Sequence, residues 1–215
     1  MAVLGLDTSN YTTSAAVFDG AEGRNESRLL TVKAGELGLR QSEALFQHVQ
    51  RLPGQLEKLA GAGLLKDIRA VGASTRPREA EGSYMPCFLA GMSQGQSMAS
   101  LLGVPFFAVS HQQGHLAAAA WSAGKTELLD SPFLAWHLSG GTTELLLVRP
   151  EGVNVRAEIL GGTSDISAGQ LIDRTGVMLG LPFPAGKALD DLYVGQHTCG
   201  TYHVKRNGYT FSLSG

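Results

Sequence analysis

The chain has 215 residues, with 17 Lys and Arg against 19 Asp and Glu, and 43% of its residues are hydrophobic. This length fits one or two domains with a substantial core, and the near-neutral charge argues against a protein that grips nucleic acid by itself. The two cysteines suggest no disulfide framework, and no apolar run is long enough to predict a membrane span. Because the first residues show no signal-peptide pattern, we expect a cytoplasmic protein.

The first part of the chain is predicted to be a mixed α/β unit with a hairpin-linked start. The hairpin is marked by Asp19-Gly20, and Pro53 is expected to end or kink the first helix. The apolar patterns predict strands over 3–7, 13–18, 29–32, 68–73 and 104–109, a polar loop over 74–82, and helices over 41–59, 85–102 and 116–121.

A second, related unit is predicted to follow. The patterns predict strands over 133–138, 143–148 and 153–160, then a helix over 170–179 and another that opens at Gly186. Ser167 and Gln170 are spaced as a capping box for the first of these helices. We therefore expect an α/β protein with a complete first domain over 1–128 and a partial second domain over 129–215.

The segment His111-Gln-Gln-Gly-His115 lies between a buried-looking strand and an alanine-rich helix. Residues four apart on a helix share one face, so both imidazoles can point at one metal ion. Two histidines at the start of a helix are also common as caps or satisfied polar groups, and the spacing alone leaves both interpretations open.

Ser139-Gly140-Gly141-Thr142 lies between two predicted strands of the second unit. Paired glycines let backbone N–H groups approach a phosphate or ribose, although such a sequence also suits a plain hairpin turn. The polar turn Asp7-Thr8-Ser9-Asn10 occupies the parallel place in the first unit. Two such turns can clamp a nucleotide between domains.

Other polar residues are ambiguous from the sequence. Asp173 can accept hydrogen bonds from ribose hydroxyls or pair with Arg174 or Arg156, and Asp190 can favour the helix dipole or meet a ligand. Arg76 and Arg78 suit phosphate or carboxylate recognition, and salt bridges with Glu79 and Glu81 explain them equally well.

In chain order, these motifs together resemble the TsaD family of tRNA threonylcarbamoyladenosine synthases, formerly called O-sialoglycoprotein endopeptidases or glycoproteases. The matching segments run along nearly the whole chain: 4–9, 111–115, 138–142, 168–169, Asp173, 179–181, 184–186 and 211–215.

The resemblance implies an actin/sugar-kinase/Hsp70-like fold made of ribonuclease H-like units, with the second unit truncated here. It implies transfer of a threonylcarbamoyl group from threonylcarbamoyl-AMP to N6 of the tRNA adenosine next to the anticodon, as an acyltransferase in tRNA processing. His111 and His115 would hold iron or zinc, and no catalytic side chain is assigned. The threonylcarbamoyl-AMP, or a related ATP- or AMP-type nucleotide, would be held by His137, Leu138, Ser139, Gly140, Gly141, Asp173, Gly186 and Asp190.

Four features depart from the family pattern. Gln113 and Gln170 each stand where the family usually has a glutamate, which we expect to remove carboxylates near the site. A charged segment over 76–82 replaces a Gly-Pro-Gly loop, and the chain ends at Gly215, before the family's third metal ligand. We therefore expect weak or no catalysis from this chain alone, with tRNA bound through a complex with TsaB- or TsaE-like proteins and a dimer as a further option.

Two alternatives stay open at this point. A TsaB-like scaffold of the same complex would need no histidine pair, so retention of both histidines argues against it. A metallopeptidase would need a general-base glutamate beside the histidines, as in His-Glu-x-x-His, which the sequence lacks.

Overall fold

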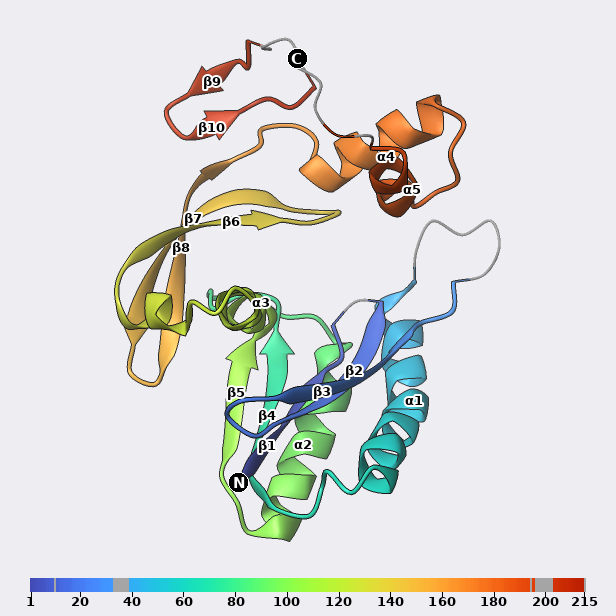
Figure 1. The fold of residues 1–215 in the computed structure, drawn as a ribbon, viewed down its shortest axis with the longest axis vertical. Coiled ribbons are helices and arrows are strands. Elements are labelled where there is room, and N and C mark those ends of the chain that lie inside the picture. The colour runs from blue at the N-terminus through green and yellow to red at the C-terminus, as the bar shows by residue number, and fades with distance from the viewer. Residues whose placement is uncertain (10, 33–38, 194, 196–202, 215) are drawn as a thin grey trace. The chain divides into compact units, whose positions relative to one another are not determined.

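The computed structural model describes residues 1–9, 11–32, 39–193, 195 and 203–214. It divides into two compact units, Met1–Ser122 and Ala123–Gly215 (Figure 1). Within those described ranges, no helix combines the length and apolar character needed to cross a membrane.

The first unit is built on one five-stranded sheet with the order β3-β2-β1-β4-β5. β1 pairs with β2, and β2 with β3, in antiparallel fashion, whereas β1, β4 and β5 run parallel. This mixed sheet is the ribonuclease H-like arrangement expected for the first domain. The strands are β1 (Ala2–Asp7), β2 (Thr12–Phe18), β3 (Gly23–Leu29), β4 (Ile68–Arg76) and β5 (Phe106–Ser110).

Two long helices, α1 (Gln41–Gly61) and α2 (Phe88–Leu102), pack against this sheet (Figure 1). Alternate strand residues such as Leu4 and Leu6 point into the core that they share with the helices, as the two-residue period of a strand requires. The small residues of α2 allow the predicted close approach: a Cβ on Gly95 would lie 3.0 Å from the ring of Phe106.

One predicted strand of the first unit was wrong, and Pro53 does not end the first helix. The third strand covers Gly23–Leu29 instead of 29–32, because it is a polar edge strand without an apolar pattern and pairs directly back from the hairpin, with Phe18 opposite Gly23. Helix α1 also continues through Pro53. Leu52 and Leu59, both almost fully buried, hold the parts before and after the proline against the core, which outweighs the hydrogen bond lost there.

The boundaries around the third helix also differ from those predicted. β4 extends to Arg76, so part of the expected polar loop is strand, and the strand predicted to be buried, β5, is an edge strand with Phe107 exposed. Helix α3 (His111–Ser122) begins immediately after β5. Both histidines of the motif therefore lie in the first two turns of one helix.

The second unit contains the expected three-stranded meander, β6 (Phe133–Leu138), β7 (Thr143–Glu151) and β8 (Asn154–Gly162), with antiparallel pairing throughout. A 3-10 turn (Thr126–Asp130) precedes it, and α4 (Ala168–Met178) and α5 (Gly186–Asp191) follow. A short hairpin of β9 (Arg206–Asn207) and β10 (Thr210–Phe211) closes the described part.

The hairpin is tied to the end of β8. Thr163 forms a parallel bridge with Phe211, and the Phe211 ring packs edge-on against Trp136 at 5.7 Å between centroids. A Cβ on Gly161 would overlap the Tyr209 carbonyl oxygen, so this approach requires glycine.

Candidate functional site

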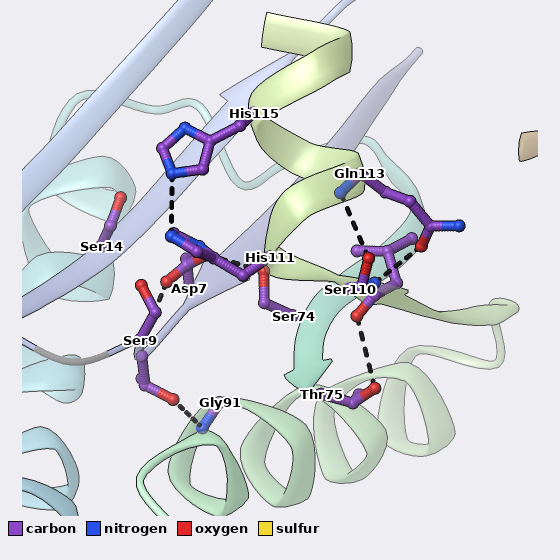
Figure 2. A network of polar contacts seen from close by, with 12 residues as sticks. Asp7, Ser9, Ser14, Ser74, Thr75, Gly91, Ser110, His111, Gln113 and His115 are labelled. Carbon is purple, nitrogen blue, oxygen red and sulfur yellow. Dashed lines mark hydrogen bonds and ion pairs between the residues drawn. The ribbon is translucent and has the colours of Figure 1, made fainter. Parts of the chain in front are cut away.

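The two histidines of α3 face each other. The Nε2 atoms of His111 and His115 lie 2.8 Å apart, and the ring centroids are 4.2 Å apart at 73° (Figure 2). The one-turn spacing of the helix produces this convergence directly. Burial of His115, together with the neighbouring His111, lowers the pKa of His115. His115 is therefore neutral at pH 7, which is the form that binds a metal.

The start of α3 is held by a reciprocal capping box. The Ser110 hydroxyl accepts a hydrogen bond from the backbone N–H of Gln113. In return, the side-chain oxygen of Gln113 accepts one from the backbone N–H of Ser110 (Figure 2). Ser110 and Gln113 are both buried. The Gln113 side chain is turned toward the helix cap, and the expectation that a carboxylate is missing from the metal site stays a prediction.

Asp7 completes the histidine cluster. Its Oδ2 lies 2.8 Å from His111 Nδ1 and accepts a 2.6 Å hydrogen bond from the Ser74 hydroxyl, and its Oδ1 accepts one from the Ser9 amide (Figure 2). Burial by itself would raise the pKa of Asp7, but the interactions with His111 and the bonds from Ser74 and Ser9 lower it to about 2. Asp7 is thus ionised at neutral pH.

Sheet topology brings these residues together. Asp7, Ser74 and Ser110 lie at the carboxyl ends of β1, β4 and β5, which are parallel neighbours and so end at the same edge of the sheet. From the sequence, Asp7 was assigned only to a nucleotide-facing turn, and Ser74 was placed in a loop. The signal that could have found them is a polar residue at the end of each predicted parallel strand.

Thr8, in the same turn as Asp7, has a structural role. Its side chain is fully buried, accepts a hydrogen bond from the Gly91 amide and donates one to the Cys87 carbonyl. Thr8 therefore joins the turn to the start of α2. Asn10, the last residue of the predicted turn, lies outside the described residues.

In the second unit, the Ser139–Thr142 loop joins β6 to β7 and rests on the start of α4. The Ser167 hydroxyl donates a 2.7 Å hydrogen bond to the Gly140 carbonyl while capping the Gln170 amide, which is the expected Ser167 half of a capping box. A Cβ on Gly169 would lie 2.6 Å from Gly140 Cα, so only glycine permits this contact. The start of α4 therefore holds the Ser139–Thr142 loop in place.

The outer side of this loop is open. Gly140 and Gly141 are exposed, and a Cβ on either would meet nothing within 4 Å. Before the loop, Leu138 is exposed, and His137 is half-buried with its Nδ1 3.9 Å from Glu144 Oε2 across the strand pair. The loop backbone is therefore exposed at the two glycines, while the backbone amides of Gly141 and Thr142 donate to the Ser139 hydroxyl.

Asp173 holds the turn between α4 and α5. Its Oδ1 accepts a 2.8 Å hydrogen bond from the Ala185 amide, directly before Gly186 at the start of α5. Within the described residues it pairs with neither arginine considered from the sequence, and Arg156 pairs with Glu151 instead. Asp190 lies exposed on α5. The structure thus brings Asp173 near Gly186, and it places the Ser139–Thr142 loop against the start of α4.

Arg76 forms a salt bridge with Glu79, the simpler of the two explanations considered for that arginine. The loop after Arg76 contacts the start of α3, because the backbone N–H of Gln112 donates a hydrogen bond to the Pro77 carbonyl. The charged segment that replaces the Gly-Pro-Gly pattern is therefore packed against the start of α3.

Asp165 was missed from the sequence. Its carboxylate accepts hydrogen bonds from the Ser212 hydroxyl, the Leu213 amide and the Ser214 amide and hydroxyl. It thereby fastens the matching segment 211–214 to the turn before α4. The signal that could have found it is the Thr163-Ser-Asp165 turn itself, which is rich in local hydrogen-bonding residues.

Comparison with known proteins decides the family. The family model described as TsaD, tRNA N6-adenosine threonylcarbamoyltransferase, matches residues 32–215. The chain belongs to the TsaD family. The tRNA N6-adenosine threonylcarbamoyltransferase of Chlorobium luteolum is 37% identical over 203 residues, which are 89% of this chain and 54% of that protein. The protein of the same name from Thermus thermophilus is 34% identical over 227 residues, covering 100% of this chain and 65% of that protein.

The chain thus spans about half to two thirds of the length of these TsaD-family relatives. Among solved structures, YeaZ from Pseudomonas aeruginosa matches this chain with a TM-score of 0.46 and 18% sequence identity. The match covers 73% of this chain and 63% of the YeaZ chain.

The histidine pair fits half of a metal site of the kind that the TsaD resemblance implies. Two imidazole nitrogens bound at about 2.0–2.1 Å to a tetrahedral ion lie about 3.3 Å apart. The observed 2.8 Å is about half an ångström shorter, so a shared ion would require the two rings to move apart by that much. Across the described part of the chain, no group of three His, Cys, Asp or Glu side chains is arranged as a metal site.

Proposed function

We propose that this chain supplies metal-binding and nucleotide-binding elements for a TsaD-type transfer of a threonylcarbamoyl group to tRNA adenosine. The observation that carries the proposal is the pair of Nε2 atoms 2.8 Å apart in a chain of this family. A non-catalytic scaffold has no need for such a pair.

In the first unit, His111 and His115 would hold one divalent ion, iron or zinc, through their Nε2 atoms. Such an ion, when bound, acts as a Lewis acid that polarises a carbonyl or phosphoryl oxygen of the substrate. With these two histidines as ligands, the other coordination positions would be filled by water, substrate or groups outside the described residues.

In the second unit, the Ser139–Thr142 loop would receive the phosphate or ribose of threonylcarbamoyl-AMP. Gly140 and Gly141 leave the loop backbone uncovered, and a bound anion would take the Gly141 and Thr142 backbone N–H groups from the Ser139 hydroxyl, which now accepts them. His137 and Leu138 lie at the entry of the loop. Asp173 would position the turn that carries Gly186, and the exposed Asp190 carboxylate would accept hydrogen bonds from ribose hydroxyls.

The metal part is tested with protein purified without a histidine tag, stripped with chelator and loaded with Zn²⁺ or Fe²⁺. We expect one ion per chain in the unaltered protein and none after His111→Ala or His115→Ala. His203→Ala is the matched control, because His203 is an exposed histidine outside the cluster. Equal metal content in all four proteins would contradict the metal site.

The nucleotide part is tested by binding of AMP to glycine variants. Gly140→Ala adds a methyl group that meets nothing within 4 Å among the described residues, so we expect normal stability and weaker AMP binding. Gly54→Ala, an equally open glycine on α1, is the control and should leave AMP binding unchanged. AMP binding that survives Gly140→Ala and Gly141→Ala would place the nucleotide elsewhere.

The reaction itself is tested by supplying the chain with tRNA, threonine, bicarbonate, ATP and TsaB- and TsaE-like partner proteins. Threonylcarbamoyladenosine that forms with the unaltered chain and not with His111→Ala supports the transferase. Tight metal and AMP binding with an acyl acceptor other than tRNA would instead assign another reaction to the same site.

A further inference from the structure

The carboxylate of Asp7 is held on three sides. One oxygen contacts both His111 Nδ1, at 2.8 Å, and the Ser74 hydroxyl, at 2.6 Å, and the other accepts the Ser9 amide at 2.8 Å (Figure 2). These contacts come from the first residue of α3, from β4 and from the turn after β1, so the carboxylate has little freedom to rotate. Its contact with His111 is therefore a fixed feature of the cluster.

This contact determines which nitrogen of His111 carries the proton. A carboxylate offers only acceptors, so the neutral His111 ring must place its hydrogen on Nδ1 and leave the lone pair on Nε2. That Nε2 atom is the one that faces His115. With His111 in that tautomer, the 2.8 Å contact between the two Nε2 atoms makes His115 the donor.

Metal binding through both Nε2 atoms would change only His115, whose hydrogen must leave Nε2. His111 already has the required tautomer. Carboxylate partners of metal-bound histidines fix the ring orientation and raise the basicity of the ligating nitrogen.

We propose that Asp7 is a positioning residue of the metal site: it holds His111 as the Nδ1–H tautomer and so keeps the Nε2 lone pair available to the ion. This inference rests on the proposed metal site. It assigns Asp7 a role distinct from the nucleotide-facing turn predicted from the sequence.

The variant Asp7→Asn separates this role from a merely structural one. The amide oxygen of asparagine can keep the hydrogen bond from the Ser9 amide, so the turn is preserved. The amide NH₂ group then faces His111 and donates to Nδ1, which forces the hydrogen onto Nε2. The change is almost isosteric, yet it should block the metal-binding nitrogen.

Asp19→Asn is the matched control. Asp19 also accepts backbone amides in a tight turn of the first unit, from Ala21 and Glu22, but it is exposed and has no histidine partner in the described part of the chain. Any general effect of removing a turn carboxylate should appear in both variants.

Two measurements test the inference on the full chain. Nitrogen-15 NMR of the imidazoles in metal-free protein reports the tautomer of His111, and competition with a chromophoric chelator reports the affinity for Zn²⁺. We expect Nδ1–H in the unaltered protein and Nε2–H in Asp7→Asn, with zinc affinity reduced roughly 10- to 100-fold. Asp19→Asn should match the unaltered protein, and thermal melting checks that each variant is folded.

An unchanged His111 tautomer in folded Asp7→Asn, or unchanged zinc affinity, would overturn the inference. If Asp7→Asn does not fold, an Nε2–H tautomer of His111 in the unaltered protein would overturn it instead. Failure of the proposed function looks different: the unaltered protein would bind no zinc while His111 still showed the Nδ1–H tautomer and lost it in Asp7→Asn.

Discussion

Ser110 and Gln113 hydrogen-bond to each other twice across the first turn of α3. The Gln113 amide donates to the Ser110 hydroxyl at 3.2 Å, and the Ser110 amide donates to the Gln113 side chain at 2.8 Å. This box begins the helix that carries both histidines. A glutamate at residue 113 could accept the same hydrogen bond, so glutamine and glutamate are equivalent for this purpose.

We therefore expect Gln113→Glu to leave the zinc affinity and the free energy of unfolding nearly unchanged, whereas Gln113→Ala should cost about 1 kcal/mol. Urea unfolding of the three proteins measures the stability. Zinc affinity that rises strongly in Gln113→Glu would show that the added carboxylate reaches the ion and that the capping assignment is wrong.

Gly176 and Ala185 are complementary in volume, because a Cβ on Gly176 would overlap the Ala185 Cβ. Gly176→Ala gains about 1 kcal/mol of helix propensity but overpacks the contact between α4 and α5 by about 1–3 kcal/mol. We expect a net loss of stability, recovered when Ala185→Gly is added. A double-mutant cycle measured by urea unfolding should give a coupling of about 0.5–3 kcal/mol, and strictly additive effects would contradict this packing.

Asp165 should make the free energy of unfolding depend on pH in the acidic range. Hydrogen bonds from Ser212, Ser214 and the Leu213 amide hold its pKa well below the usual range. A lowered folded-state pKa means that the stabilisation is complete above the unfolded value of about 3.9 and is lost as the pH falls through the folded value. Asp165→Asn should therefore be less stable than the unaltered chain at pH 7, and the difference should shrink below about pH 4.

Urea unfolding at a series of pH values measures this difference. Asp191→Asn is the control, since Asp191 forms an exposed pair with Lys187 and should contribute little at any pH. A gap between Asp165→Asn and the unaltered chain that is constant with pH would rule out the carboxylate as its source.

Thr8 supplies the hydroxyl that pairs with the Cys87 carbonyl and the Gly91 amide. Thr8→Val keeps the shape but removes both of these buried hydrogen bonds, which should cost about 1–3 kcal/mol. Thr8→Ser keeps the hydroxyl and should recover most of that loss. If Thr8→Val instead weakened AMP binding at unchanged stability, Thr8 would be a ligand contact, as the polar-turn interpretation requires.

Elements with a clear local pattern were predicted well from the sequence. The hairpin at Asp19-Gly20, the helix over residues 85–102 and the three-strand meander of the second unit all appear close to their expected limits. Strand β3 was misplaced because an edge strand needs no apolar face, and Pro53 was overweighted because core packing on both sides of it holds the helix together.

The candidate site divides in the same way. The sequence predicted that Gly140 and Gly141 form a loop with an exposed backbone. It did not predict the role of Gly169, which lies 29 positions after Gly140 and lets the start of α4 pack against that loop. Its requirement comes from a contact between a helix start and a turn. Such a contact exists only once the second unit has folded.

The convergence of His111 and His115 is a property of the sequence alone, because a helix places residues four apart on one face whatever surrounds it. Local sequence does not determine which residue pairs with His111. Asp7 is 104 residues away, and the two meet because β1 and β5 lie on either side of β4 and end at the same edge of the sheet. Local periodicity therefore determined the histidine pair, and strand order, which depends on long-range packing, decided which carboxylate orients it.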